Sequence, residues 1–130
     1  MLRKVLILFF SVVLISCEDE NSPVGTVTRF IDCLGTGDYP KAYALTHNPS
    51  WGLSTETFGA EDAFGGISAT KIIEVKLESS DEVTALVHCK YYAEDGINGS
   101  GLFTENFHLS LEDYQWKITK IDVLQKEKTK

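Results

Sequence analysis

The sequence lacks an apolar run long enough to cross a membrane. Its longest run, VLILFFSVVLI at 5–15, has 11 residues, whereas a membrane-spanning helix needs about 20. Basic residues are also few, because 12 lysines and arginines face 19 aspartates and glutamates, for a formal net charge of −7. A protein that binds a polyanion needs clustered positive charge, so this balance argues against a nucleic-acid partner.

Motifs of the common enzyme classes are also absent from the sequence. It contains no nucleophile motif, no glycine-rich phosphate loop and no Cys-x-x-Cys pair. The two glycines of AFGGI, at 63–67, have no strand-to-helix context and are expected in a turn before the first strand. We therefore expect no cofactor, and we expect a protein without catalytic activity, with an enzyme as the alternative.

The start of the chain has the parts of a secretory signal. Arg3 and Lys4 are followed at once by the apolar run at 5–15, which is too short to be an anchor and has the length of a signal core. The alternative is a buried N-terminal strand with a cysteine in the core.

The segment LISC, at 14–17, resembles the lipobox of bacterial lipoproteins. The resemblance implies removal of a signal peptide, 1–16, and a membrane tether formed by lipid on Cys17. Residues 17–21 would form an acidic tether, whose three acids at 18–20 resemble surface-export signals or act as a hydrated spacer. We therefore expect an outer-membrane lipoprotein of the cell envelope, on the periplasmic side or at the surface.

Two cysteines remain if Cys17 carries lipid. Loss of Arg3 and Lys4 leaves 10 basic residues against 19 acidic ones, a net charge of −9. Cys33 and Cys89 would lie in an oxidising compartment and could form one disulfide. Two buried free thiols are the favoured interpretation, because both cysteines lie on apolar faces of their predicted elements.

The first half of the mature chain has helical spacing. Ser22 is a good N-cap, Pro23 suits the first turn, and Gly35 or Gly37 can end the helix in the left-handed conformation. A second helix is expected over 38–47, capped by Asp38, with His47 near its C-terminal end, where a cation suits the helix dipole.

The second half of the chain alternates with the period of β-strands. Four strands are predicted, and the turn stretches SSDE, DGINGSG and EDYQ separate them. In the last strand Ile121 and Val123 have the opposite parity to Trp116 and Ile118, which predicts a bulge near Thr119-Lys120 that returns both residues to the core. The inward sets are Ile73, Val75 and Leu77; Val83, Ala85, Val87, Cys89 and Tyr91; Phe103, Glu105, Phe107, Leu109 and Leu111; and Trp116 and Ile118.

This order of elements resembles the nuclear-transport-factor-2-like, or cystatin-like, cone fold. The resemblance rests on SPVGTVTRFIDCLGTGDYPKAYAL at 22–45 and on the Trp-x-Ile strand at 116–118. It implies an α+β domain over 22–124, with helices packed on a curved antiparallel sheet of about four strands, followed by a flexible basic tail at 125–130. Because many functions share this fold, the resemblance supports architecture more than activity.

Glu105 is the candidate catalytic residue. It interrupts an apolar row, so it is expected on the inner face, where burial raises the pKa of a carboxyl group as a general base requires. A three-residue loop, with Gly99 left-handed, would pair Gly96 with Ser100 and place Tyr91 opposite Glu105 as its hydrogen-bond partner. A solvated acid at the rim of the sheet is the favoured interpretation, because isolated inward acids near strand ends are usually solvated or paired.

Two other groups of residues are candidates for a site. The same register makes His88 and His108 cross-strand neighbours, which is a weak candidate for a zinc site because further ligands are lacking, so an incidental pair is favoured. Five aromatic residues are candidates for the lining of a pocket: Trp51, Phe58, Phe64, Phe103 and Phe107.

Three functions follow from these observations. The main hypothesis is a lipid-anchored envelope module that binds a small molecule or a protein without catalysis. The first alternative is a small isomerase or dehydratase that uses Glu105 as general base, as enzymes of the cone fold use acids in their pockets. The second is a structural role as a homodimer that assembles through the sheet.

Overall fold

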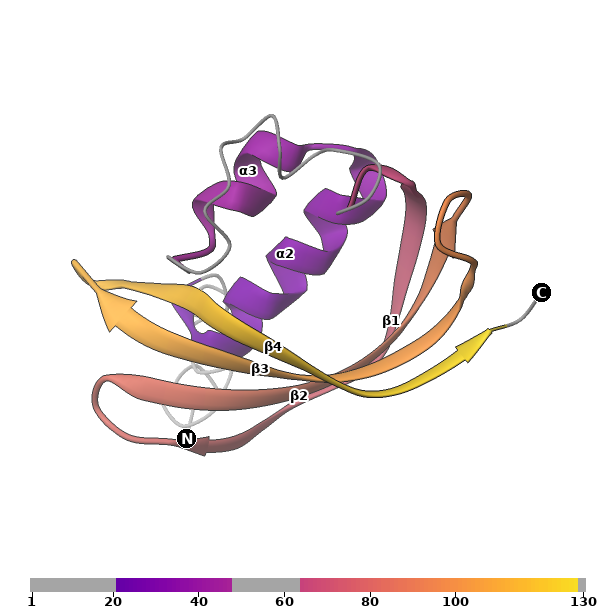
Figure 1. The fold of residues 1–130 in the computed structure, drawn as a ribbon. Coiled ribbons are helices and arrows are strands. Elements are labelled where there is room, and N and C mark those ends of the chain that lie inside the picture. The colour runs from indigo at the N-terminus through magenta and orange to yellow at the C-terminus, as the bar shows by residue number, and fades with distance from the viewer. Residues whose placement is uncertain (1–20, 48–63, 129–130) are drawn as a thin grey trace, which may run out of the picture.

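The computed structural model describes residues 21–47 and 64–128. They form an α+β fold in which two short helices lie on the concave side of a curved four-stranded sheet (Figure 1). The elements are α2 (Pro23–Thr36), α3 (Tyr39–Ala44), β1 (Ile67–Ser80), β2 (Thr84–Asp95), β3 (Gly101–Glu112) and β4 (Gln115–Lys128). The strands pair antiparallel in the order β1-β2-β3-β4, which confirms the predicted meander. No helix within the described ranges is long and apolar enough to span a bilayer.

Both helices begin at the predicted caps. The Ser22 hydroxyl accepts a hydrogen bond from a backbone N–H of the first turn at 2.9 Å, and Pro23 occupies the first helical position. Gly37 ends α2 with a φ of 76°, which glycine adopts without the strain that a Cβ atom would cause. The Asp38 carboxylate then accepts from the backbone N–H of Lys41 at 3.3 Å and caps α3.

The second helix is shorter than predicted. It ends at Ala44, and the segment after it pairs with β4 instead of continuing the helix. The Ile118 N–H donates to the carbonyl of Leu45, and the N–H of His47 donates to the carbonyl of Ile118, both at 2.8 Å. The prediction that His47 caps the helix is therefore wrong, and its imidazole contacts the carboxylate of Glu112.

β1 does not follow the simple alternation that was predicted for it. Three register shifts interrupt its pairing with β2, and an extra residue in a strand turns the following side chains to the other face. Ile72 and Val75 consequently pack against the core, whereas Ile73 and Leu77 are 53% and 46% exposed. Val83, also predicted to face inward, precedes β2 and is exposed.

The predicted bulge in the last strand is confirmed. Thr119 is an extra residue in β4 between the partners of His108 and Leu109, and its hydroxyl donates to the carbonyl of His108 at 3.1 Å. The bulge turns Ile121 onto the core, as predicted. Val123 pairs with Glu105 and so lies on the same face of the sheet, but it is 59% exposed, so its predicted return to the core is wrong.

β4 also extends beyond the predicted end of the domain at 124. It continues to Lys128, which pairs with Gly101, so residues 125–128 belong to the sheet and not to a tail. The close approach depends on glycine, because a Cβ atom on Gly101 would lie 2.2 Å from the carbonyl oxygen of Glu127.

The core lies between α2 and the concave face of the sheet. Phe30 of α2 makes edge-to-face contacts with Phe64 and Phe107, with ring centroids 5.9 and 6.1 Å apart. α2 makes most of its sheet contacts with β1, where the Thr70 hydroxyl donates to the carbonyl of Ile31 at 3.0 Å. The largest fully buried side chains are Phe30, Phe107, Ile31, Leu34, Ile118, Val27, Val87 and Cys89.

Candidate functional site

Glu105 lies on the concave face of β3 and is only 6% exposed. Tyr91, from the neighbouring strand β2, donates its hydroxyl to Glu105 Oε1 at 2.9 Å. The inward position of Glu105 and its hydrogen bond with Tyr91 are therefore as predicted. The favoured interpretation, a solvated acid at the rim of the sheet, is wrong, because the acid is buried and paired.

An aromatic stack and a cation lie beside this pair. Phe103 stacks on Tyr91 with ring centroids 5.4 Å apart, and Lys126 Nζ lies 5.2 Å from the centroid of Phe103. The Lys126 ammonium also donates to the carbonyl of Asn98 at 3.4 Å. Tyr91 is thus held between the carboxyl group that it bonds and the ring that it stacks against.

Burial decides the protonation of this group of side chains. Burial raises the pKa of Glu105 from 4.5 to about 7, and the hydrogen bond from Tyr91 and the charge of Lys126 lower it only in part. Burial, and then the charge of Glu105, raises the pKa of Tyr91 well above its ordinary value. Near neutral pH the carboxyl group of Glu105 therefore changes between its protonated and ionised forms, while Tyr91 stays protonated and remains a hydrogen-bond donor.

The register that was predicted for this hairpin is shifted by two residues. Cys89 pairs with Glu105 and Tyr91 pairs with Phe103, whereas Tyr91 was expected opposite Glu105. The turn begins at Asp95, earlier in the chain than predicted, because the Asp95 carboxylate accepts hydrogen bonds from the backbone N–H groups of Ile97 and Asn98 at 2.9 and 2.8 Å. A shift of two keeps each side chain on its face, so Glu105 still points inward.

The two cysteines of the domain are free thiols. Cys89 is fully buried beside Glu105, and burial together with that charge raises its pKa to about 12. Cys33 on α2 is half-buried, and burial raises its pKa as well. Neither thiol is poised as a nucleophile, because the thiolate is the reactive form.

Three of the five candidate pocket aromatics pack within the described fold. Phe107 is fully buried in the core, Phe64 packs against it through Phe30, and Phe103 stacks on Tyr91. None of these three lines either of the hollows described below. Trp51 and Phe58 lie outside the described residues.

The two histidines of the sheet are not cross-strand partners. His88 pairs with Asn106, and its Nδ1 lies 3.1 Å from the Asn106 Oδ1 atom. His108 lies opposite Leu86, and its Nε2 is 2.7 Å from Asp122 Oδ2. The expectation that they face each other is wrong, and the part of the chain that the structure describes contains no group of three metal-ligating side chains.

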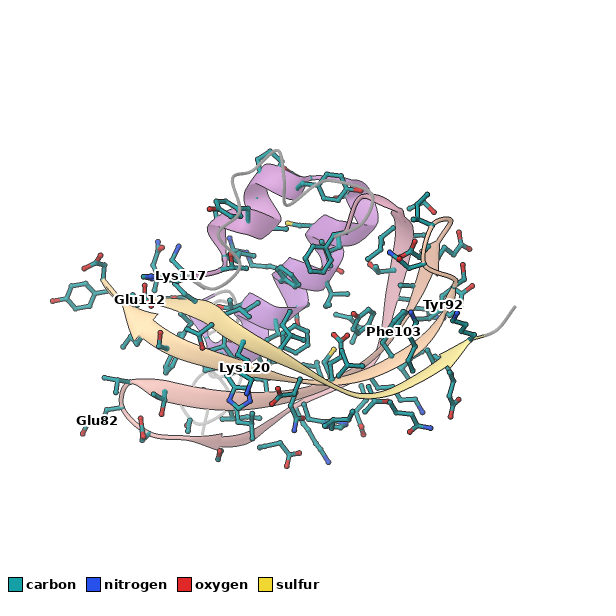
Figure 2. All side chains as sticks on the ribbon, in the orientation of Figure 1. Glu82, Tyr92, Phe103, Glu112, Lys117 and Lys120 are labelled. Atoms are coloured by element: carbon teal, nitrogen blue, oxygen red, sulfur yellow. The ribbon has the colours of Figure 1, made fainter. Side chains whose placement is uncertain are left out.

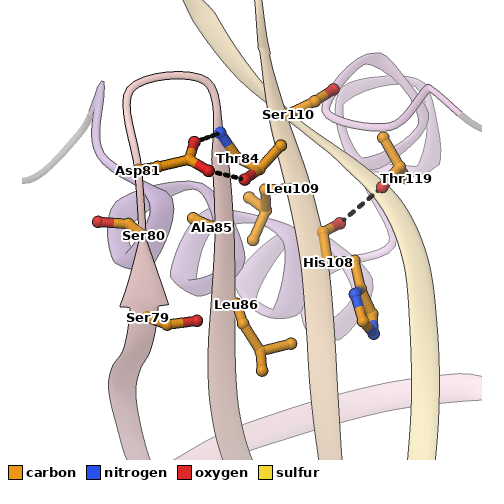
Figure 3. Close-up of a pocket in the computed structure, with 10 residues that line it drawn as sticks. All are labelled: Ser79, Ser80, Asp81, Thr84, Ala85, Leu86, His108, Leu109, Ser110 and Thr119. Atoms are coloured by element: carbon orange, nitrogen blue, oxygen red, sulfur yellow. Dashed lines mark hydrogen bonds between the residues drawn. The ribbon is translucent and has the colours of Figure 1, made fainter.

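One hollow, of about 540 Å³, lies at the turn between β1 and β2 (Figure 3). The Asp81 carboxylate accepts from the backbone N–H and the hydroxyl of Thr84, and the Thr119 hydroxyl donates to the carbonyl of His108. Ser110, also in this lining, donates its hydroxyl to Glu112. These polar groups brace the turn and the bulge.

A second hollow, of about 580 Å³, lies between both helices and the turn from β3 to β4. Its size is that of sites for small molecules. Lys117 marks this end of the sheet and Phe103 marks the other end (Figure 2). The hollow is thus remote from Glu105, and its lining consists of Asn21, Thr26, Arg29, Lys41, Ala44, Leu45, Asp113, Tyr114, Gln115, Trp116 and Lys117.

Comparisons with known proteins identify a fold and no family. No protein-family model matches the chain, and no curated protein matches it. Solved structures do match, among them the intermembrane space region of the chloroplast protein ARC6, with a TM-score of 0.50 and 17% identity. That match covers 76% of this chain and 91% of the other. At such low identity the similarity supports an α+β fold alone.

Proposed function

We propose that this protein is a lipid-anchored binding module of the cell envelope, built on a cystatin-like cone and without catalytic activity. Two helices followed by a curved antiparallel meander support the cone as its architecture (Figure 1). The lipobox at 14–17 supports the anchor on Cys17. The proposed location is the outer membrane, on its periplasmic or its outer surface.

The burial of Glu105 is the observation that favours binding over catalysis. A general base must come within hydrogen-bond reach of the proton that it removes. Glu105 is 6% exposed, accepts the hydroxyl of Tyr91, and lines neither of the two hollows. The pKa of Glu105 is raised because the carboxyl group is buried among packed side chains, so the raised pKa does not require a catalytic role.

Chemical modification tests whether Glu105 is sealed. A water-soluble carbodiimide with glycine ethyl ester, at pH 6, modifies carboxyl groups that solvent reaches, and peptide mass spectrometry locates the products. A sealed Glu105 stays unmodified in the native protein, although its pKa of about 7 keeps it in the protonated, reactive form. Glu94, exposed on β2, is the matched control and reacts. Modification of Glu105 at the rate of Glu94 would contradict the proposal.

The anchor is tested by fractionation of cells that express the full chain. Wild-type protein is expected in the membrane fraction and resists extraction with salt, because an acylated cysteine is held by hydrophobic burial and not by charge. Cys17→Ser removes the acylated thiol and leaves the signal uncleaved. Wild-type protein that is released by salt would refute the anchor.

An isomerase or dehydratase that uses Glu105 remains the second candidate. It is favoured by the carboxyl pKa of about 7 and by the hydrogen bond from Tyr91, which together provide a proton acceptor near neutral pH. This candidate needs a path from solvent to Glu105, which the modification experiment also detects.

Assembly through the sheet is the third candidate. The first part of the β4 edge is covered, because Thr46 forms a bridge with Ile118. Farther along β4, Val123 and Leu124 are 59% and 55% exposed, and such apolar side chains on an edge strand favour pairing with another chain. Sedimentation velocity from micromolar to near-millimolar concentration tests this, and a monomer throughout would refute a dimer.

A further inference from the structure

We propose that the hollow between α2, α3 and the β3–β4 turn binds the phosphate of an anionic lipid headgroup in the membrane that carries the protein. This proposal rests on the proposed function, because it uses the anchor on Cys17. It adds a second, non-covalent contact with the membrane and gives it a definite place on the domain.

Charge is the first observation that supports it. Among the described residues that line the hollow, three are cations, Arg29 from α2, Lys41 from α3 and Lys117 from β4, and one is an acid, Asp113. These described lining residues sum to a formal charge of +2, in a chain whose net charge is −7. Arg and Lys side chains that converge from separate elements are the usual ligands of a phosphate group.

The packing of the hollow fixes its shape. Lys117 donates its ammonium group to the carbonyl of Ala44 at 2.5 Å, which joins the end of α3 to β4. Asn21 donates its side-chain amide to the carbonyl of Tyr114 at 3.2 Å and joins the start of α2 to the β3–β4 turn. These two contacts hold the three elements together around the cations.

Covalent reach is the second observation. Asn21, which lines the hollow, follows Cys17 by four residues. An extended chain spans about 3.5 Å per residue, so Asn21 lies within about 14 Å of an acylated Cys17. The hollow must therefore stay close to the lipid headgroups, whatever the orientation of the rest of the domain.

Two aromatic residues suit a contact with a membrane interface. Tyr114 is 88% exposed at the tip of the β3–β4 turn, where its φ of 66° is a left-handed conformation that favours glycine or asparagine. Trp116 lines the hollow and packs against the core. Tyrosine and tryptophan are the side chains that membrane interfaces favour.

The overall charge means that any electrostatic attraction to the membrane must be local. A mature chain with a net charge of −9 is repelled by an anionic membrane, so diffuse electrostatic adsorption cannot hold it there. Attraction has to come from a place where cations gather, and the hollow is such a place. A free phosphate would offer the same chemistry, but only a headgroup is kept beside the hollow by the anchor.

Native mass spectrometry of the full chain in a neutral maltoside detergent tests the proposal. The probes are dioleoylphosphatidylglycerol, the zwitterionic dioleoylphosphatidylcholine, and glycerol 3-phosphate as a soluble competitor. The variant is Arg29→Gln/Lys41→Gln. Its matched control, Lys76→Gln/Lys120→Gln, removes the same charge from exposed side chains of β1 and β4. A circular dichroism melt checks that each variant folds, and Lys41→Gln alone serves if the double variant does not.

Phosphatidylglycerol is expected to be retained, phosphatidylcholine to be lost, and glycerol 3-phosphate not to displace the lipid at equal concentration. The hollow variant should weaken retention by roughly 25-fold, since each of its two cations near a lipid surface contributes about fivefold, whereas the control should leave it within about twofold. Equal retention of the two lipids, displacement by glycerol 3-phosphate, or equal loss in the two double variants would overturn the headgroup site. The same spectra report the mass at Cys17, so absence of acyl chains refutes the anchor separately.

Discussion

Glu105 makes the stability of this protein depend on pH in a direction opposite to that of acids that accept hydrogen bonds at the surface. Its pKa is raised from 4.5 to about 7 by burial in the folded protein. Each pKa unit corresponds to about 1.4 kcal/mol, so ionisation of Glu105 costs the folded state about 3 kcal/mol more than it costs the unfolded chain. The side chain is 6% exposed, so screening by water reduces this figure only slightly.

The sign follows from proton binding. Between pH 4.5 and about 7 the folded state holds a proton on Glu105 that the unfolded chain has released. The free energy of unfolding therefore falls as the pH rises through this window, at up to about 1.4 kcal/mol per pH unit. Above about pH 7 both states are ionised and the loss is complete. Acids with lowered pKa, such as Asp81 and Asp122, which mainly accept hydrogen bonds, act below this window and in the opposite direction.

Glu105→Gln is the variant that isolates this effect. An amide of nearly the same shape can still accept the Tyr91 hydroxyl through its oxygen, and it carries no charge at any pH. At pH 8 we expect the free energy of unfolding of the variant to exceed that of wild type by about 2–3 kcal/mol. This corresponds to a Tm that is higher by roughly 10 °C for a domain of this size. At pH 4.5 the two should differ by less than about 1 kcal/mol.

Urea unfolding followed by circular dichroism, at half-unit steps from pH 4.5 to 8.5, measures both curves. Glu94→Gln removes one charge from an exposed position on β2, so an effect that it shares with Glu105→Gln belongs to net charge. Parallel curves for wild type and Glu105→Gln over this range would refute the reasoning, because they would mean that Glu105 ionises alike in the folded and unfolded states.

Three further predictions test the packing, the turn and the thiols. Phe107→Ala empties a fully buried position and should lower the free energy of unfolding, measured in urea, by about 3–5 kcal/mol. Ile97→Ala, at a side chain 54% exposed, should change it by less than about 0.5 kcal/mol. Similar losses in the two variants would contradict the described core. Tyr114→Gly removes a tyrosine from a left-handed backbone conformation, so it should raise the free energy of unfolding by about 1 kcal/mol and therefore raise Tm. The same variant should weaken retention of phosphatidylglycerol. A lower Tm would refute the strain at this position. Iodoacetamide at pH 8 should alkylate Cys33 before Cys89 in the native protein and both after unfolding, since with a pKa of about 12 Cys89 is thiolate in only about one molecule in ten thousand; a species that resists alkylation until it is reduced would reveal a disulfide instead.

Local signals in the sequence were sufficient for the starts of both helices, for the end of α2 and for the order of the strands. Ser22, Gly37 and Asp38 act through their own backbone neighbours, so their roles are readable without knowledge of the fold. The bulge at Thr119 was predictable because the parity of the apolar residues changes across it. Glu105 was detectable as an acid in an apolar row, and its face survived an error of two in the register.

The errors arose where distant groups compete with local preference. Asp95 closes the hairpin through backbone N–H groups, and this fixes a register that loop length alone does not. The helix α3 gives up its last turn because backbone groups of Leu45 and His47 bond to Ile118, more than 70 residues away in the chain. The register shifts of β1 follow from its pairing with β2, and no turn-forming residue within β1 indicates where they occur.

The cationic hollow could not be predicted from the sequence. Arg29, Lys41 and Lys117 come from three elements and form no cluster along the chain. Lys126 was assigned to a solvated tail because it lies in a basic stretch, although it contacts Phe103 beside the buried acid. Charge patterns along a chain can identify solvent-exposed charged segments, but they do not show which charged side chains the fold brings together.

The most direct test of the proposed binding role is a turnover measurement with an activated carbon acid. The probe 5-nitrobenzisoxazole opens when a carboxylate base removes one proton, and its product is followed by absorbance. With Glu105 sealed beneath Tyr91 and Phe103, we expect the wild-type protein at pH 8 to react no faster than Glu105→Gln and Glu94→Gln. A wild-type rate well above both variants, which rises with the ionisation of a group of pKa about 7, would contradict the binding module and identify Glu105 as the base of an enzyme.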